Sequence, residues 1–267
     1  MSEVTDIGSF LNSDRPLITV IFYARTPGQA METILPSLPY CDAYCWQMDF
    51  LEGKYRTREN IGMVISAMGD HPCYVTDYMR GNANPGLSYD GIARELLLAL
   101  DCGAKLIDVT GDMYDAQPFE LSFDGKAASR QKDLIAEIHR RGGEALMSSH
   151  VLQYRTTEQV YAIARAHAER GADIAKIVTT ADNSEQLDEN LRTTVFLHEK
   201  LPVKTLFLCG GTFCRLHRRI GPLLGSCIYL CRWVLPDDDP SIFLQPDIFT
   251  ARSLMKNAGF AIPDPGL

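Results

Sequence analysis

Short apolar runs alternate with longer amphipathic stretches from one end of the chain to the other. The runs are typical of strands buried in a parallel sheet, whereas the stretches place apolar residues at helical spacing. We expect eight strands, at 17–24, 41–48, 72–76, 105–110, 144–149, 173–178, 203–208 and 226–230. Helices are expected near 29–35, 57–68, 90–100, 126–141, 157–170, 185–200 and 247–258, with only a short turn at 216–224 after the seventh strand.

Eight repeats of strand and helix predict an α/β fold in which the strands close into a (βα)8 TIM barrel. The chain has 267 residues, 46% of them hydrophobic, a length at which one barrel domain is ordinary. We therefore expect a single domain over 1–267, with a short N-terminal extension at about 1–16. In such barrels the chemistry lies where strands end and the following loops begin, so candidate residues are sought at those positions.

Charge and cysteine content narrow the classes of partner. The formal net charge of −8 argues against a nucleic-acid partner, which requires a concentrated basic surface. We find no secretory signal and no apolar stretch of membrane-spanning length, and we expect a cytoplasmic protein without a membrane partner. The eight cysteines form no CxxC pair, which favours free thiols over a zinc site; we expect neither a metal nor a cofactor.

Lys176 is the most informative residue because it interrupts the buried run 172–178. A buried ammonium is costly unless a carboxylate pairs with it or its proton is lost, in which case the amine can attack a carbonyl. Lys176 shares strand parity with Ile174 and Val178, so the three side chains are expected on one side of the sheet. A structural lysine that reaches solvent or pairs with a carboxylate is the alternative.

His150 ends the strand that precedes the lysine strand, which makes the two residues neighbours in a barrel. A lysine can form a Schiff base with a ketone, and a histidine beside it can move protons on and off the adjacent carbon. A hydrogen-bonded loop histidine is the alternative. We predict Lys176 and His150 as the catalytic pair.

These residues resemble the type I 3-dehydroquinate dehydratases, Schiff-base enzymes of the shikimate and quinate pathways that fold as (βα)8 barrels. Segment 171–177 is similar to the family's Schiff-base strand, and Ser149-His150 followed by Thr156-Thr157 is similar to its histidine motif. The resemblance implies conversion of 3-dehydroquinate to 3-dehydroshikimate, a hydro-lyase reaction in aromatic amino acid biosynthesis or quinate metabolism. It also implies a homodimer acting on a small anionic ketone.

The resemblance assigns substrate-binding roles to further residues. Arg215, which follows Gly211 and precedes Gly225-Ser226, is carried over as the ligand of the substrate carboxylate. Ser241 and Gln245 correspond to the serine and glutamine of the family's lid, although the Ala-Pro-Gly between them is missing. An arginine fork matches a carboxylate, which agrees with that role on physical grounds.

Departures from the family pattern concentrate at the end of the site that holds ring hydroxyls. The second strand's Glu-x-Arg-x-Asp keeps its aspartate as Asp49 but has Cys45 and Gln47 in place of the glutamate and arginine. An arginine of the third strand is replaced by Asp77. Thr110 replaces a glutamate of the fourth strand, which predicts that His150 lacks its acidic partner. We expect Gln47, Asp49 and Thr110 to contact a substrate that differs from the family's own.

Three functions remain open. The first is a Schiff-base dehydratase acting on 3-dehydroquinate or a related anionic cyclic ketone. The second is a class I aldolase-like enzyme that forms its Schiff base with another carbonyl compound. The third is a non-catalytic ligand-binding relative, which the replaced glutamate and arginine residues favour.

Overall fold

The computed structural model describes residues 8–79, 86–233 and 245–263, which form a barrel of eight parallel strands. The hydrogen-bonded order is β7-β6-β5-β4-β3-β2-β1-β8, and the Cys227 N–H donates to the Thr205 carbonyl where β8 meets β7. The fold is therefore the expected (βα)8 TIM barrel. The strands are β1 (Leu17–Phe22), β2 (Ala43–Gln47), β3 (Cys73–Thr76), β4 (Leu106–Thr110), β5 (Glu144–His150), β6 (Ile174–Thr180), β7 (Lys204–Gly210) and β8 (Ile228–Cys231).

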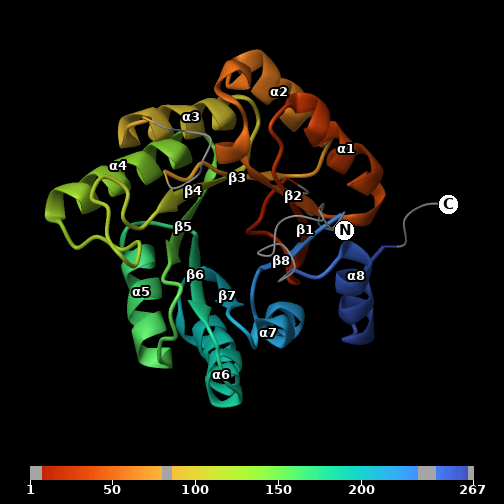
Figure 1. Ribbon diagram of the computed structural model, residues 1–267, viewed down its shortest axis with the longest axis vertical. Helices are drawn as coiled ribbons and strands as arrows, with labels where there is room; N and C mark the ends of the chain where they lie inside the picture. The colour runs from red at the N-terminus through yellow and green to blue at the C-terminus, as the bar shows by residue number, and fades with distance from the viewer. Residues whose placement is uncertain (1–7, 80–85, 234–244, 264–267) are drawn as a thin grey trace, which may run out of the picture.

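Helices surround the strands as an outer ring (Figure 1). Seven of them begin at a Ser, Thr, Asp or Asn whose side-chain oxygen accepts a backbone N–H of the first turn, as N-cap residues do. The exception, α7, is short and is followed by the turn Gly221–Leu224, as expected for the reduced seventh helix. The helices are α1 (Pro27–Ser37), α2 (Arg58–Ser66), α3 (Tyr89–Asp101), α4 (Gly125–Arg140), α5 (Thr157–Glu169), α6 (Ser184–Lys200), α7 (Cys214–Ile220) and α8 (Ile248–Asn257).

Alternate residues of each strand point into the barrel, where they form one apolar cluster. Ile174 and Val178 belong to this cluster, so the side that they were expected to share with Lys176 is the barrel interior. Outward-facing residues pack against the helices in a second, larger cluster. Interior members include Leu17, Ala43, Cys45, Tyr74, Leu106, Leu146, Ile174, Val178, Leu206, Leu208, Ile228 and Leu230.

The segment before β1 closes the amino-terminal end of the barrel. Phe10 is fully buried among the interior residues and meets the Tyr74 ring edge-on, with ring centroids 6.4 Å apart. The Glu144 carboxylate fixes this segment by accepting the Phe10 N–H at 2.9 Å and the Ser9 hydroxyl. Closing this end leaves the carboxyl ends of the strands as the open face, where Lys176 and His150 lie.

Candidate active site

Lys176 lies inside the barrel, in the middle of β6, with 5% of its surface exposed. In the strand register it stands opposite Ser148 of β5 and Leu206 of β7. His150 ends β5 opposite Val178, two residues closer to the open end than Lys176. A carbonyl compound bonded to the Lys176 amine would therefore extend toward the imidazole.

The Lys176 ammonium is paired with the buried Asp108 carboxylate of β4. Lys176 Nζ lies 3.2 Å from Asp108 Oδ2, and it also donates to the hydroxyls of Tyr74 (3.0 Å) and Tyr78 (2.5 Å). Both tyrosines donate in turn to Asp108 Oδ2, Tyr74 at 2.5 Å and Tyr78 at 2.7 Å. Asp108 Oδ1 accepts the Ser148 hydroxyl at 2.6 Å. The lysine thus has the carboxylate partner that a buried cation requires.

The surroundings of Asp108 keep it ionised. Burial alone would raise its pKa, but the Lys176 ammonium and hydrogen bonds from Ser148, Tyr74 and Tyr78 outweigh burial, so the pKa lies below its ordinary value. The pKa of each tyrosine is raised well above 10, first by burial and then by the negative charge of Asp108. At neutral pH the cluster therefore holds a carboxylate and two protonated phenols.

His150 is paired with Glu120, a residue of the loop between β4 and α4. Glu120 Oε2 lies 2.6 Å from His150 Nδ1 and accepts the His150 backbone N–H at 2.9 Å. A proton on Nδ1 that bonds to this carboxylate leaves Nε2 as the basic nitrogen. The expectation that Thr110 deprives the histidine of its acidic partner is wrong, because the following loop supplies another carboxylate.

The loop that carries Glu120 is held by buried polar groups. Glu120 has a left-handed backbone (φ 49°), and its carbonyl accepts the Ser149 hydroxyl at 2.7 Å. Arg170 of α5 donates to the carbonyl oxygens of Gly111 and Ser122, at either end of the loop. Gly111 is required here, since a Cβ at this position would lie 2.5 Å from the Glu120 oxygen. These contacts fix the carboxylate against the imidazole.

Arginines gather on α7, where Arg215 was expected to bind a carboxylate. Arg215 is exposed, whereas Arg218, about one turn later, is buried with 6% of its surface accessible. Arg218 Nε donates to the Cys209 carbonyl at 2.6 Å. With its amide nitrogen facing the Leu230 carbonyl, Gln245 accepts Arg218 Nη1 at 2.5 Å. The structure therefore brings Gln245 together with Arg218.

Arg218 is a buried cation among neutral groups. Burial lowers its pKa to about 10, so it remains charged at neutral pH. Within the described part of the chain, no carboxylate forms an ion pair with it, and its hydrogen-bond partners are a carbonyl and an amide. A buried guanidinium without a countercharge favours binding of an anion.

The remaining predicted site residues lie at strand ends. Asp49 follows β2, is 2% exposed, and accepts the Thr76 hydroxyl at 3.3 Å; burial raises its pKa to about 6. Gln47 ends β2 and Thr110 ends β4, and both are partly exposed. Ser241 lies outside the described residues. Whether these residues contact a substrate stays a prediction.

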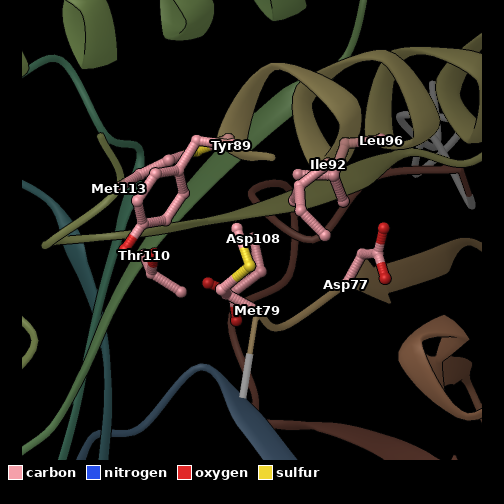
Figure 2. A pocket seen from close by; sticks show the side chains of 8 residues that line it. All are labelled: Asp77, Met79, Tyr89, Ile92, Leu96, Asp108, Thr110 and Met113. Carbon is pink, nitrogen blue, oxygen red and sulfur yellow. The ribbon is translucent and has the colours of Figure 1, made fainter. Parts of the chain in front are cut away.

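A small pocket opens beside Asp108, between the carboxyl ends of β3 and β4 and the first turns of α3 (Figure 2). Asp77 lies at its edge with the carboxylate turned toward the helices, where Arg56 Nη1 lies 3.1 Å away and also contacts Glu95. Asp77 thus replaces an expected arginine but faces the helical layer. The pocket is lined by Asp77, Met79, Tyr89, Ile92, Leu96, Asp108, Thr110 and Met113.

The described residues provide neither a metal site nor a membrane-spanning helix. No group of three or more His, Cys, Asp or Glu side chains in this part of the chain is placed to hold a metal ion. None of its helices combines the length and apolarity needed to span a membrane. All eight cysteines are free thiols, as the spacing predicted.

The fold and site define a TIM barrel with an ion-paired lysine and a carboxylate-bound histidine at its open end. A family model for type I 3-dehydroquinase matches residues 29–240, and the chain belongs to this family. Membership indicates a hydro-lyase of the 3-dehydroquinate type. No significant match is found among curated proteins.

Solved structures of 3-dehydroquinate dehydratases share the fold. The enzyme from Geobacillus kaustophilus HTA426 superposes with a TM-score of 0.76 at 17% identity, covering 92% of each chain. The enzyme from Enterococcus faecalis gives a TM-score of 0.71 at 19% identity, covering 92% of this chain and 95% of its own. The Clostridium difficile type I enzyme gives 0.74 at 16% identity, covering 92% and 94%. At these identities the likeness concerns the fold.

Proposed function

We propose that the protein is a Schiff-base dehydratase that removes water from 3-dehydroquinate or a related anionic cyclic ketone. The observation that supports this most is the amine of Lys176, buried in the barrel, paired with Asp108 and followed toward the open end by His150. In this mechanism the amine condenses with the ketone, and the resulting iminium acidifies the neighbouring carbon. Family membership supports the same reaction class.

His150 is proposed as the acid and base that acts at carbon. With Nδ1 bonded to Glu120, Nε2 can remove the proton next to the iminium and then return it to the departing hydroxyl. The carboxylate holds the ring in one orientation and stabilises the imidazolium that forms after proton removal. Hydrolysis of the product imine then releases Lys176.

Arg218 is proposed as the ligand of the substrate carboxylate. Its burial and its neutral partners support this role, and Gln245 can donate its amide to the same anion once the amide turns from Leu230. The role first expected for Arg215 stays a prediction, which exposure on α7 does not favour. The two arginines lie one turn apart, so paired substitutions separate them.

Substrate identity can differ from that of the family. Cys45 lies in the apolar interior cluster and Gln47 at the strand end, at positions where the resemblance expects a glutamate and an arginine. Loss of groups that bind hydroxyls changes substrate preference more than reaction type. An aldolase-like reaction on another ketone is the second candidate, supported by the two phenols rather than arginines near the amine. The expected homodimer, shikimate or quinate role and cytoplasmic location stay predictions.

A trapping experiment tests the proposed function. The protein is incubated with 3-dehydroquinate and sodium borohydride, and peptide mass spectrometry locates the reduced adduct. We expect the adduct on Lys176 and, without borohydride, the absorbance of 3-dehydroshikimate. An adduct without dehydroshikimate favours the aldolase-like reaction, which a panel of 3-keto acids then examines. Absence of both adduct and product contradicts the proposal.

A further inference from the structure

Among its described contacts, the Lys176 amine lies nearest to the phenol of Tyr78. Tyr78 Oη lies 2.5 Å from Nζ, whereas Asp108 Oδ2 lies 3.2 Å away. His150 is not in hydrogen-bond contact with this nitrogen among the described contacts; its Nδ1 is occupied by Glu120. Among the described residues Tyr78 is therefore better placed than the imidazole to exchange protons with this nitrogen.

From this geometry we infer that Tyr78 is a catalytic residue that carries protons between Lys176 and the substrate oxygen during imine formation. The inference rests on the proposed Schiff-base chemistry and adds a residue that neither the sequence nor the family resemblance indicated. His150 keeps its proposed role at carbon. The two steps of the reaction would thus use different proton carriers.

Hydrogen bonds already connect the required path. The Lys176 ammonium donates to the Tyr78 hydroxyl, and that hydroxyl donates to Asp108 Oδ2 at 2.7 Å. The high pKa of Tyr78, caused first by burial and then by Asp108, keeps the phenol protonated and able to act as an acid. Tyr78 follows the carboxyl end of β3, on the side of the open end, and its ring lies beside that of His150.

The proton balance closes without any other reactant. Asp108 accepts one proton from the ammonium, and the neutral amine attacks the ketone carbon while Tyr78 gives its proton to the ketone oxygen. The phenolate then takes a proton from the nitrogen of the carbinolamine and returns it to the hydroxyl, which leaves as water. As the C=N bond forms, Asp108 returns the proton it received to the Tyr78 phenolate, so ketone and ammonium become iminium and water.

Tyr74 provides a matched comparison within the same cluster. It too accepts from Lys176 and donates to Asp108, at 3.0 and 2.5 Å. Unlike Tyr78 it is fully buried, and Phe10 packs against its ring below the amine. Tyr74 lies within β3, four residues before Tyr78 and nearer the closed end of the barrel, so we expect it to stabilise the ion pair rather than to contact the substrate oxygen. The phenol of Tyr78 also lies beside His150, with ring centroids 5.1 Å apart.

The test compares Tyr78→Phe with Tyr74→Phe by the rate at which borohydride traps an adduct on Lys176. The probes are 3-dehydroquinate and pyruvate, quenched at timed intervals. General acid–base catalysis contributes about 10²-fold or more, so Tyr78→Phe should slow trapping by about that factor, and Tyr74→Phe by less than about fivefold. Equal rates for wild type and Tyr78→Phe would overturn the inference, as would equal slowing in both variants.

Two further comparisons cover a Tyr78→Phe variant that does not fold and a substrate other than 3-dehydroquinate. If Tyr78→Phe fails to fold by circular dichroism, 3-fluorotyrosine at position 78 preserves the shape while making the phenol more acidic. We expect its trapping rate at one fixed pH to differ from that of wild type, because the rate of general acid–base catalysis depends on the acidity of the catalytic group; an unchanged rate overturns the inference. If wild type traps pyruvate but not 3-dehydroquinate, the proposed substrate fails while slow Tyr78→Phe trapping still supports Tyr78. No wild-type adduct with either probe overturns both proposals.

Discussion

Buried polar side chains on the two sides of the barrel's open end have different kinds of partner. On the β4–β6 side the nitrogen groups have acidic partners: the Lys176 amine contacts Asp108, and the His150 imidazole contacts Glu120. On the β7–α7 side, Arg218 meets a backbone carbonyl and the Gln245 amide. Paired charges can exchange protons with little change in net charge, whereas a buried cation among neutral groups keeps a positive potential for an incoming anion.

The difference suits the two sides to different parts of the proposed reaction. The β4–β6 side is suited to proton chemistry, since each group there has a donor or acceptor within hydrogen-bond distance. The β7–α7 side is suited to holding a carboxylate over the amine. The following expected outcomes examine that division, beginning with the largest effect.

Removal of the amine should cause the largest loss. Lys176→Met keeps an unbranched side chain of similar length but removes the nucleophile, so turnover of 3-dehydroquinate should fall by about 10⁴-fold or more. Steady-state assays measure this, and borohydride should no longer modify the variant at any residue. An adduct elsewhere would relocate the nucleophile and break the assignment of proton chemistry to the β4–β6 side.

Substitutions of Arg218 and Arg215 test whether the β7–α7 side binds the substrate carboxylate. Arg218→Lys should raise KM by about 10- to 100-fold, because a charge-assisted, two-pronged contact contributes about 1.5–3 kcal/mol. The control, Arg215→Lys, should change KM by less than about twofold because its side chain is exposed. A larger effect at Arg215 would return the carboxylate-binding role to that residue.

Glu120 should affect the step at carbon without affecting the step at nitrogen. Glu120→Gln removes the charge facing His150 Nδ1, so kcat should fall by about 10- to 100-fold. Borohydride trapping on Lys176 should continue at near wild-type rate. Slowed trapping in this variant would show that the two steps share their proton carriers.

The glycine below Glu120 tests how the acidic partner is positioned. Gly111→Ala would place a Cβ 2.5 Å from the Glu120 carbonyl oxygen and 3.0 Å from Ser149 Oγ. We expect a loss of about 1–3 kcal/mol in the free energy of unfolding, measured with urea, together with reduced kcat. Gly125→Ala, at the first position of α4 with nothing within 4 Å of its Cβ, should leave stability unchanged or slightly raised. Equal behaviour of the two variants would contradict the close approach.

Asp49 should have its effect on folding rather than on catalysis, as a dependence of the free energy of unfolding on pH. Burial raises its native pKa to about 6 from an ordinary value of 3.8, so native structure binds the proton more tightly than unfolded chain does. The stabilisation that Asp49 gives the native state is fully present below about pH 4 and is lost as the pH rises through about 6. Between about pH 4 and pH 6, the free energy of unfolding of wild type, measured with urea, should fall by about 2–3 kcal/mol relative to that of Asp49→Asn. Parallel curves would show that Asp49 has an ordinary pKa.

Much of the fold follows from local pattern. Apolar runs separated by capped amphipathic stretches predicted eight strands and their helices. The parity of Ile174, Lys176 and Val178 predicted that they share one face, which the structure shows to be the interior. Two further spacing patterns in the sequence indicate residues of the site. Tyr74, Thr76 and Tyr78 are spaced by two, which places them on one face of β3 and its extension. Cys214 and Arg218 are spaced by four, which places Arg218 on the buried face of α7.

Glu120 could not be found in this way, because it lies in a loop without periodicity and contacts a histidine 30 residues away. The sequence by itself determined the barrel, the lysine strand and the order of the strand ends, since these depend on short-range spacing. Tertiary structure alone decided that Asp108 faces Lys176, that Tyr78 stands beside the amine and that Arg218 meets Gln245. Those partnerships depend on how strands and loops far apart in sequence close around one another.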